Sequence, residues 1–121
     1  MTLICGRVNF FSGPHLVFKY WLRGKFMRII IVGCGKVGSS IASELNLEGH
    51  EISVVDINHG AVDKLANSLD VLGIEGNGAT YDVLIEAGAE YADLLIAATA
   101  RDEINLYSCL MAKAAGGTPP I

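Results

Sequence analysis

From Met27 onwards, short apolar runs alternate with stretches in which apolar residues recur every three or four positions. The run IIIV, residues 29–32, is β-branched and stops at Gly33, which predicts a buried strand. Val37, Ile41 and Leu45 then recur at intervals of four residues, which predicts a helix that ends near Gly49. A strand followed by a helix is the start of a repeating βα unit.

The same alternation continues to the end of the chain. Strands are expected over residues 50–56, 71–76 and 92–99, and helices after Asn58, after Thr80 as far as Gly88, and over residues 102–115. Asn58 and Thr80 are residue types that cap helix N-termini. This pattern predicts an α/β fold, a Rossmann-like doubly wound parallel sheet of four strands in the order 3-2-1-4. Because the sequence stops at GGTPPI, where a fifth strand would begin, the sheet is expected to be incomplete at its C-terminal edge.

The composition agrees with a sheet that is buried on both faces. Of the 121 residues, 51% are hydrophobic, and the mean hydropathy of +0.42 is high for a soluble protein. Strands covered by helices on both sides read as nearly continuous apolar runs, which explains these values. The length suits one domain. No apolar stretch approaches the roughly 18 residues of a membrane-spanning helix, so we expect no membrane span.

Residues 1–26 differ from the remainder in charge and composition. They hold four of the nine basic residues (Arg7, Lys19, Arg23 and Lys25) and no acidic residue, whereas residues 27–121 hold all thirteen acidic ones. They also hold most of the aromatic residues and show no clear period. We interpret residues 1–26 as a basic, aromatic extension outside the fold, from translation begun upstream of Met27. Contact with a membrane surface or a partner is the alternative, and residues 27–121 form the predicted domain.

The cysteines and histidines do not predict a disulfide framework or a metal site. Cys5, Cys34 and Cys109 show no CxxC spacing, and three scattered cysteines favour a reducing, cytosolic setting. The three histidines lack ligand-like spacing with the cysteines. The net charge of −4 gives no reason to expect a nucleic-acid partner.

The sequence GCGKVG, residues 33–38, matches the G-x-G-x-x-G pattern of dinucleotide-binding turns. In such a turn Gly33 permits the tight change of direction, Gly35 lets a pyrophosphate approach the backbone, and Gly38 allows the helix to pack closely on the strand. The free N–H groups and the positive dipole at the helix start favour an anion. The pattern by itself is weak, but here it lies between a predicted strand and a predicted helix.

Asp56 ends the second predicted strand, 18 residues after Gly38, close to the spacing of about 20 expected for a carboxylate that binds a ribose. A carboxylate there accepts hydrogen bonds from the ribose hydroxyls and repels a 2′-phosphate, which favours NAD or an adenine nucleotide over NADP. A solvated residue at the end of a strand is the structural alternative.

Other residues near the turn are more ambiguous. Lys36 could face a phosphate or lie in solvent, and Cys34 is more easily explained as a small filling residue than as a redox sensor. Thr99 and Ala100 are expected at the carboxyl end of the fourth strand, facing the crevice where open α/β sheets bind ligands. The Thr99 hydroxyl could reach a ribose or pyrophosphate there, or only cap the helix that follows.

The sequence shows no catalytic group. His15 lies outside the predicted domain, His50 begins a strand and His59 begins a helix, so none is placed as an acid or base. Asp102 and Glu103 suit the acidic first turn of a helix. We therefore expect nucleotide binding without enzymatic activity.

Residues 27–58, MRIIIVGCGKVGSSIASELNLEGHEISVVDIN, resemble the N-terminal nucleotide-binding domain, called KTN or RCK, of regulatory subunits of Trk/Ktr-type potassium uptake systems, the TrkA family. The resemblance continues to about Gly117, and none of it falls on residues 1–26. More specific than the glycine turn are the GNGAT loop, the run AGAEYADLLIA and the pattern T-x-x-D-E-x-N.

The resemblance implies a cytoplasmic regulatory domain, peripheral to the inner face of the plasma membrane, that binds NAD(H) or ATP/ADP. It implies a membrane-embedded potassium transporter subunit as partner, and a homodimer or larger homo-oligomer whose change of shape gates K⁺ uptake. It places residues 33–37 at the pyrophosphate, Asp56 at the ribose, Thr99 and Ala100 along the phosphate and ribose, and Asn77 near the adenine. Family members continue with a fifth strand and a further domain, neither of which this sequence contains.

The residues alone also allow another class of protein, the cofactor-binding fragment of an NAD-dependent dehydrogenase. A catalytic base in a longer chain would favour the dehydrogenase, and a second small domain without a base would favour the regulator. The sequence does not choose between NAD(H) and ATP, because both present adenosine and phosphates to the same turn.

Overall fold

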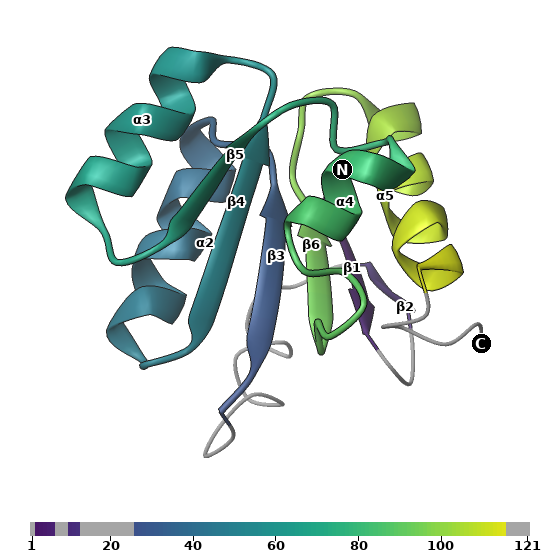
Figure 1. Ribbon diagram of the computed structural model, residues 1–121, viewed down its shortest axis with the longest axis horizontal. Coiled ribbons are helices and arrows are strands. Elements are labelled where there is room, and N and C mark those ends of the chain that lie inside the picture. Colours follow the sequence, from purple (N-terminus) through teal and green to yellow (C-terminus); the bar gives the residue numbers. More distant parts are fainter. Residues whose placement is uncertain (1, 7–9, 13–25, 116–121) are drawn as a thin grey trace.

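The computed structural model describes residues 2–6, 10–12 and 26–115. In the described residues, one mixed sheet is covered by two helices on each face (Figure 1). The strands are β1 (Leu3–Gly6), β2 (Phe10–Ser12), β3 (Arg28–Val32), β4 (Glu51–Asp56), β5 (Leu72–Glu75) and β6 (Leu94–Ala97). The helices are α2 (Lys36–Leu47), α3 (His59–Ser68), α4 (Tyr81–Glu86) and α5 (Asp102–Ala114).

The six-stranded sheet has the order β2-β1-β6-β3-β4-β5. The pairs β3–β4, β3–β6 and β4–β5 are parallel, so the four predicted strands have the predicted order 3-2-1-4. The α/β, Rossmann-like fold class is confirmed. The strands alternate with helices because each apolar run is followed by an amphipathic segment that can bury only one stripe.

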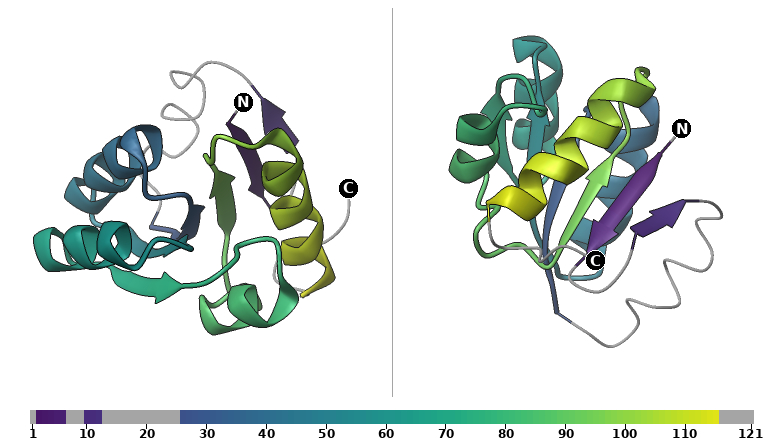
Figure 2. Two further views of the ribbon diagram at one scale, coloured as in Figure 1. Left: turned by 90° about the horizontal axis from the view of Figure 1, so that it is seen from above. Right: turned by 90° about the vertical axis from the view of Figure 1, so that its right-hand side faces the viewer.

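The sheet has two strands beyond the four predicted, and both come from within residues 1–26, which the sequence pattern places outside the fold. Strand β1 pairs antiparallel with β6, from Leu3 opposite Ala97 to Gly6 opposite Leu94, and β2 pairs antiparallel with β1. Leu3, Ile4 and Cys5 are buried, so β1 belongs to the core. Figure 2 shows the β1 ribbon beside β6 and α5. The strand was missed because its partner lies about 90 residues away, and such pairing leaves no local period in so short a run.

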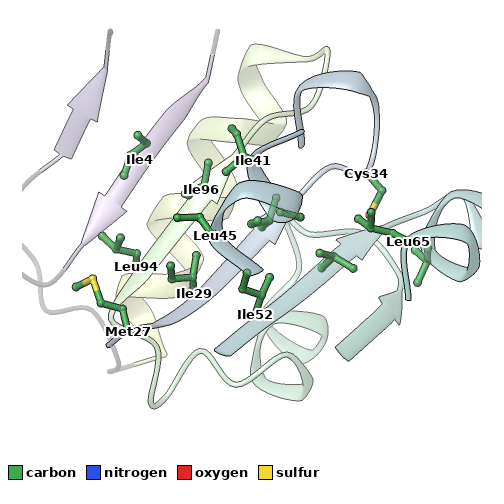
Figure 3. Packing of buried hydrophobic residues seen from close by; sticks show 14 residues of the cluster. Ile4, Met27, Ile29, Cys34, Ile41, Leu45, Ile52, Leu65, Leu94 and Ile96 are labelled. Atoms are coloured by element: carbon green, nitrogen blue, oxygen red, sulfur yellow. The ribbon is translucent and has the colours of Figure 1, made fainter. Parts of the chain in front are cut away.

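Alternate side chains of the central strands enter two different cores. Ile29, Ile31, Leu94 and Ile96 face α2 and α3, where they meet residues such as Ile41, Leu45 and Leu65 (Figure 3). Ile30, Val32, Leu95 and Ala97 face α4 and α5, where they meet Leu84, Cys109 and Ala112. This period of two buries both faces of the strands. Because β3, β4, β5 and β6 run parallel, their carboxyl ends lie together at one end of the sheet.

The local signals for helix ends have mixed outcomes. Asn58 caps α3, because its side chain accepts a hydrogen bond from the Ala61 N–H at 3.1 Å. Gly49 follows α2 with a φ of +88°, as expected for a helix-ending glycine. Thr80 precedes α4, but its side chain makes no capping bond; its hydroxyl instead donates to the Asn77 carbonyl at 2.8 Å. The predicted Thr80 side-chain cap is therefore wrong.

Candidate functional site

The glycine turn joins β3 to α2 at the carboxyl edge of the sheet. Gly33 has a φ of +110°, and its N–H donates to the Val55 carbonyl of the neighbouring strand at 2.7 Å. A Cβ at Gly33 would lie 2.9 Å from the Ala98 carbonyl oxygen, just beyond β6. Only glycine combines this backbone conformation with so close an approach to two neighbouring segments.

The second and third glycines of the motif have opposite surroundings. A Cβ at Gly38 would lie 1.8 Å from the Gly33 carbonyl oxygen, so the first turn of α2 packs directly on the end of β3. A Cβ at Gly35 would meet nothing within 4 Å. Gly35 is also the N-cap residue of α2, and no side chain caps this helix end. An open backbone at a helix N-terminus is suited to an anion such as a phosphate group.

The Asp56 carboxylate is tied to the glycine turn. Its Oδ2 accepts a hydrogen bond from the Cys34 N–H at 2.7 Å, and its Oδ1 accepts one from the Asn58 N–H at 2.8 Å. These two bonds fix the orientation of the carboxylate at the end of β4. Each carboxylate oxygen can accept a second hydrogen bond, so the capacity to bind ribose hydroxyls is retained.

A cleft of about 360 Å³ opens between these loops. Six of the predicted site residues line it: Gly33, Gly35, Asp56, Asn77, Thr99 and Ala100. It is also lined by residues that sequence reasoning did not assign to the site: Val32, Val55, Ile57, Gly76, Gly78, Ala98, Arg101 and Ile104. Its position outside the carboxyl ends of parallel strands, between β3 and β6, is the position at which open α/β sheets bind ligands.

Four predicted site residues, Cys34, Lys36, Val37 and Gly38, do not line the cleft. The Cys34 side chain packs toward Leu65 in the core under α2 and α3 (Figure 3). Burial, together with the negative charge of Asp56, raises the pKa of the Cys34 thiol to about 11. The packing of the Cys34 side chain in this core fits the filling role. Lys36 lines a separate groove between α2 and α3.

A buried side chain that the sequence reasoning missed holds the loop after β6. Asn105 of α5 is fully buried, and its Oδ1 accepts bonds from the Thr99 N–H at 3.0 Å and the Thr99 hydroxyl at 2.7 Å. Its Nδ2 donates to the Thr99 carbonyl at 3.2 Å. The hydroxyl of Thr99 is thus engaged within the protein. Asn105 is the final residue of the pattern T-x-x-D-E-x-N, a signal that was present in the sequence but without an assigned role.

The loop after β5 closes the opposite side of the cleft. Asn77 accepts a bond from the Ala79 N–H at 2.9 Å through its side chain, forming a tight local turn. A Cβ at Gly78 would lie 2.3 Å from the Val32 side chain, so this loop packs directly on the end of β3. The Gly76 N–H donates to the Asp56 carbonyl at 2.9 Å and ties the loop to β4.

Two charged residues face the cleft, among the residues described as lining it: Asp56 and Arg101. Arg101 is exposed at the start of α5 and pairs with Glu103 at 2.7 Å. Sequence reasoning did not consider Arg101, because a lone basic residue before a helix has no distinctive spacing. The described part of the chain therefore gives the cleft one carboxylate on the side of β4 and one guanidinium on the side of α5.

The described histidines lie outside the cleft lining. His50 is buried, and its Nδ1 accepts a bond from the Met27 N–H at 3.1 Å. His59 is exposed on α3 and contacts the carboxylates of Asp63 and Glu75, both at 2.9 Å. His15 falls outside the described residues. Within the described residues, no helix is long and apolar enough to cross a membrane.

The parallel core, the glycine turn and the strand-end carboxylate define the class of Rossmann-like nucleotide-binding domains. A family model described as the TrkA-N domain matches residues 29–121. The chain therefore belongs to the TrkA-N domain family.

The chain is also similar to proteins named as parts of potassium uptake systems. It is 42% identical, over 83 residues, to the "Trk system potassium uptake protein TrkA" of Azorhizobium caulinodans, which covers 69% of this chain and 18% of that protein. The protein of the same name from Vibrio alginolyticus is 40% identical over 93 residues, 77% of this chain and 20% of that protein. A "TrkA homolog" from Pyrococcus abyssi is 34% identical over 87 residues, which are 72% of this chain and 38% of that protein. The matched part of the chain thus spans between 18% and 38% of the length of these relatives.

Proposed function

We propose that the cleft binds an adenine nucleotide, NAD(H) or ATP/ADP, and that binding regulates a potassium uptake system. The observation that carries the proposal is that Gly35 and Asp56 line one cleft together. Gly35 offers an open helix N-terminus for the phosphates, and Asp56 offers oriented carboxylate oxygens for the ribose. Arg101 at the rim adds a positive charge that favours the phosphates.

In this proposal each predicted residue keeps a distinct role. The backbone of residues 33–37 faces the pyrophosphate, with Lys36 and Val37 contributing N–H groups rather than side chains. Asn77 lies toward the adenine, and Thr99 and Ala100 lie along the phosphates and ribose. Cys34 and Gly38 act through the shape of the turn. A nucleotide that fits one arrangement of the protein better than another shifts the population toward that arrangement.

The names of the relatives support the wider setting. We infer that the chain is a regulatory rather than catalytic domain, and that its partner is a membrane-embedded potassium transporter subunit. This setting is cytoplasmic, at the inner face of the plasma membrane. The dehydrogenase alternative gains no support from the described cleft, where the Asp56 carboxylate already accepts two backbone hydrogen bonds.

Assembly into a homodimer or larger homo-oligomer is part of the proposal. The outer face of α5 carries Leu106, Tyr107 and Leu110, each about half exposed, at the i, i+1 and i+4 positions of one helix face. Exposed apolar side chains grouped in this way favour contact with another protein surface.

Calorimetric titration of the full chain with NADH, NAD, ATP and ADP tests the binding proposal. Tight binding of at least one ligand is expected, and Asp56→Ala should weaken it tenfold or more, about 1.4 kcal/mol. Asp70→Ala is the matched control, because Asp70 is an exposed carboxylate before the amino end of β5, whereas Asp56 lies at the carboxyl end of β4. The ranking of the ligands identifies the metabolic signal. Absence of binding by a folded chain would refute the nucleotide proposal.

A further inference from the structure

Two buried cysteines from distant parts of the sequence lie together beside the edge of the sheet. Cys5 is on β1 and Cys109 is on α5, 104 positions apart, and neither is exposed. Both belong to the core on the side of α4 and α5. The Cys5 thiol donates to the Cys109 backbone carbonyl over 3.9 Å. The Cys5 side chain on β1 therefore contacts the residue Cys109 on α5 inside one core.

The third cysteine is separated from this pair by the sheet. Cys34 belongs to the core on the opposite face, under α2 and α3. The side chains of β3 and β6 lie between the two cores. Of the three possible pairings, the folded chain therefore permits only the one between Cys5 and Cys109.

The two thiols differ in acidity in a way that suits exchange with a disulfide. The hydrogen bond from Cys109 and the positive charge of Lys113 hold the pKa of the Cys5 thiol below its ordinary value. The same hydrogen bond, burial and the charge of Cys5 raise the pKa of the Cys109 thiol. Because a thiolate is the attacking species, Cys5 is the member of the pair that reacts first.

We propose that Cys5 and Cys109 form a reversible disulfide that fastens β1 to α5, with a small disulfide of the glutathione class as the oxidant. When β1 opens away from α5 and exposes Cys5, the Cys5 thiolate attacks one sulfur of the oxidant, forming a mixed disulfide and releasing one glutathione thiolate. Cys109, on losing its proton, then attacks the Cys5 sulfur, and the second glutathione thiolate leaves. The protein loses two electrons and two protons, and the oxidant is reduced to two thiols.

The bond would act on the strand that covers the edge of β6. Strand β1 is joined to the parallel sheet through its pairing with β6 and through its packing against α5. A disulfide would make that attachment covalent and close a very long loop, which restricts the unfolded chain. The oxidised protein is therefore expected to hold β1 in place under conditions that release it from the reduced protein.

The experiment uses the full chain, incubated with oxidised glutathione near neutral pH and analysed by thiol counting and non-reducing peptide mass spectrometry. The thiol count should fall from three to one, with a single crosslinked peptide pair that contains Cys5 and Cys109. The Cys34→Ser variant keeps only the proposed pair, and it should lose both remaining thiols at the rate at which the natural chain loses its two. Cys109→Ser should give no internal crosslink and keep glutathione on Cys5.

Thermal unfolding gives the second readout. The crosslinked chain should melt at least about 5 °C higher than the reduced chain, and dithiothreitol should reverse the shift. A thiol count that remains at three, a crosslink that contains Cys34, or glutathione that stays on Cys5 without closure would overturn the proposal. A crosslink that leaves the melting temperature unchanged would overturn the fastening role.

Discussion

The Asp56 carboxylate accepts a 2.7 Å hydrogen bond from the Cys34 N–H and so joins the end of β4 to the glycine turn. Its second oxygen holds the Asn58 N–H, which begins the approach to α3. The residue singled out as the ribose-binding acid is therefore also a structural part of the ligand-free turn. Its two roles can be separated by measuring stability and binding independently.

Asp56→Ala is expected to destabilise the ligand-free chain by about 1–3 kcal/mol, because two backbone N–H groups lose their charged acceptor. Urea unfolding monitored by circular dichroism measures this change. The free energy of unfolding of Asp70→Ala, a change before the amino end of β5, should stay within about 0.5 kcal/mol of that of the natural chain. Equal stability of the Asp56→Ala and natural chains would show that the two bonds are not needed to hold the turn.

The four parallel strands and their order were predictable, because strands buried on both faces give compact apolar runs and their crossover helices show a period near four. The glycine turn and Asp56 were predictable, because their spacing reflects one local βαβ unit. Strand β1 was not predictable, since its pairing with β6 depends on backbone contacts between distant segments. Asn105 and Arg101 were missed because their roles follow from where α5 begins relative to β6.

Gly35→Ala and Gly38→Ala should separate binding from folding. A methyl group at Gly35 meets no protein atom, so the fold should keep its stability while nucleotide affinity falls about tenfold. A methyl group at Gly38 would collide with the Gly33 carbonyl, so this variant should lose about 1–3 kcal/mol of stability. Urea unfolding and calorimetry on both variants measure the two effects. Similar losses of stability in the two variants would contradict the conclusion that Gly35 faces open space and Gly38 is tightly packed.

Asn105→Ala should destabilise the chain by about 1–3 kcal/mol, because the partly buried Thr99 N–H and carbonyl would lose their partner. Nucleotide affinity should fall as well, since Thr99 lines the cleft. Leu106→Ala is the control, because the neighbouring Leu106 is about half exposed and should tolerate the change. Urea unfolding measures the stability, and calorimetric titration measures the affinity. If neither quantity changes in Asn105→Ala, Asn105 does not hold the loop.

The free energy of unfolding should decrease at alkaline pH because the pKa of the Cys34 thiol is raised in the folded chain. Its pKa is about 11 in the folded chain and 9.0 is its ordinary value, so the unfolded chain loses the proton first as pH rises. The stabilisation from keeping this thiol protonated is therefore fully present below pH 9 and is lost as the pH rises toward 11. The free energy of unfolding should fall by about 1–2 kcal/mol from this cause between pH 8.5 and 10.5. Urea unfolding at both pH values measures it. Cys34→Ala should show a decline smaller by that amount, and an identical decline would exclude this source.

Removal of residues 1–26 should expose the edge of β6 and the side chains that β1 covers. Leu95 and Ala97 pack in the same core as Leu3 and Cys5, so the shortened chain loses buried apolar area as well as the β1–β6 backbone bonds. An uncovered edge strand recruits another edge, so this chain should be less stable and should self-associate. Light scattering after gel filtration measures the association, and amide hydrogen exchange over Leu94–Ala97 measures how well the backbone N–H groups of β6 are protected.

Ile4→Asp in the full chain, which places a charge at a buried β1 position, should weaken the same attachment without removing any other residue. A shortened chain that stays monomeric, equally stable and equally protected over β6 would instead support the interpretation that the fold begins at Met27.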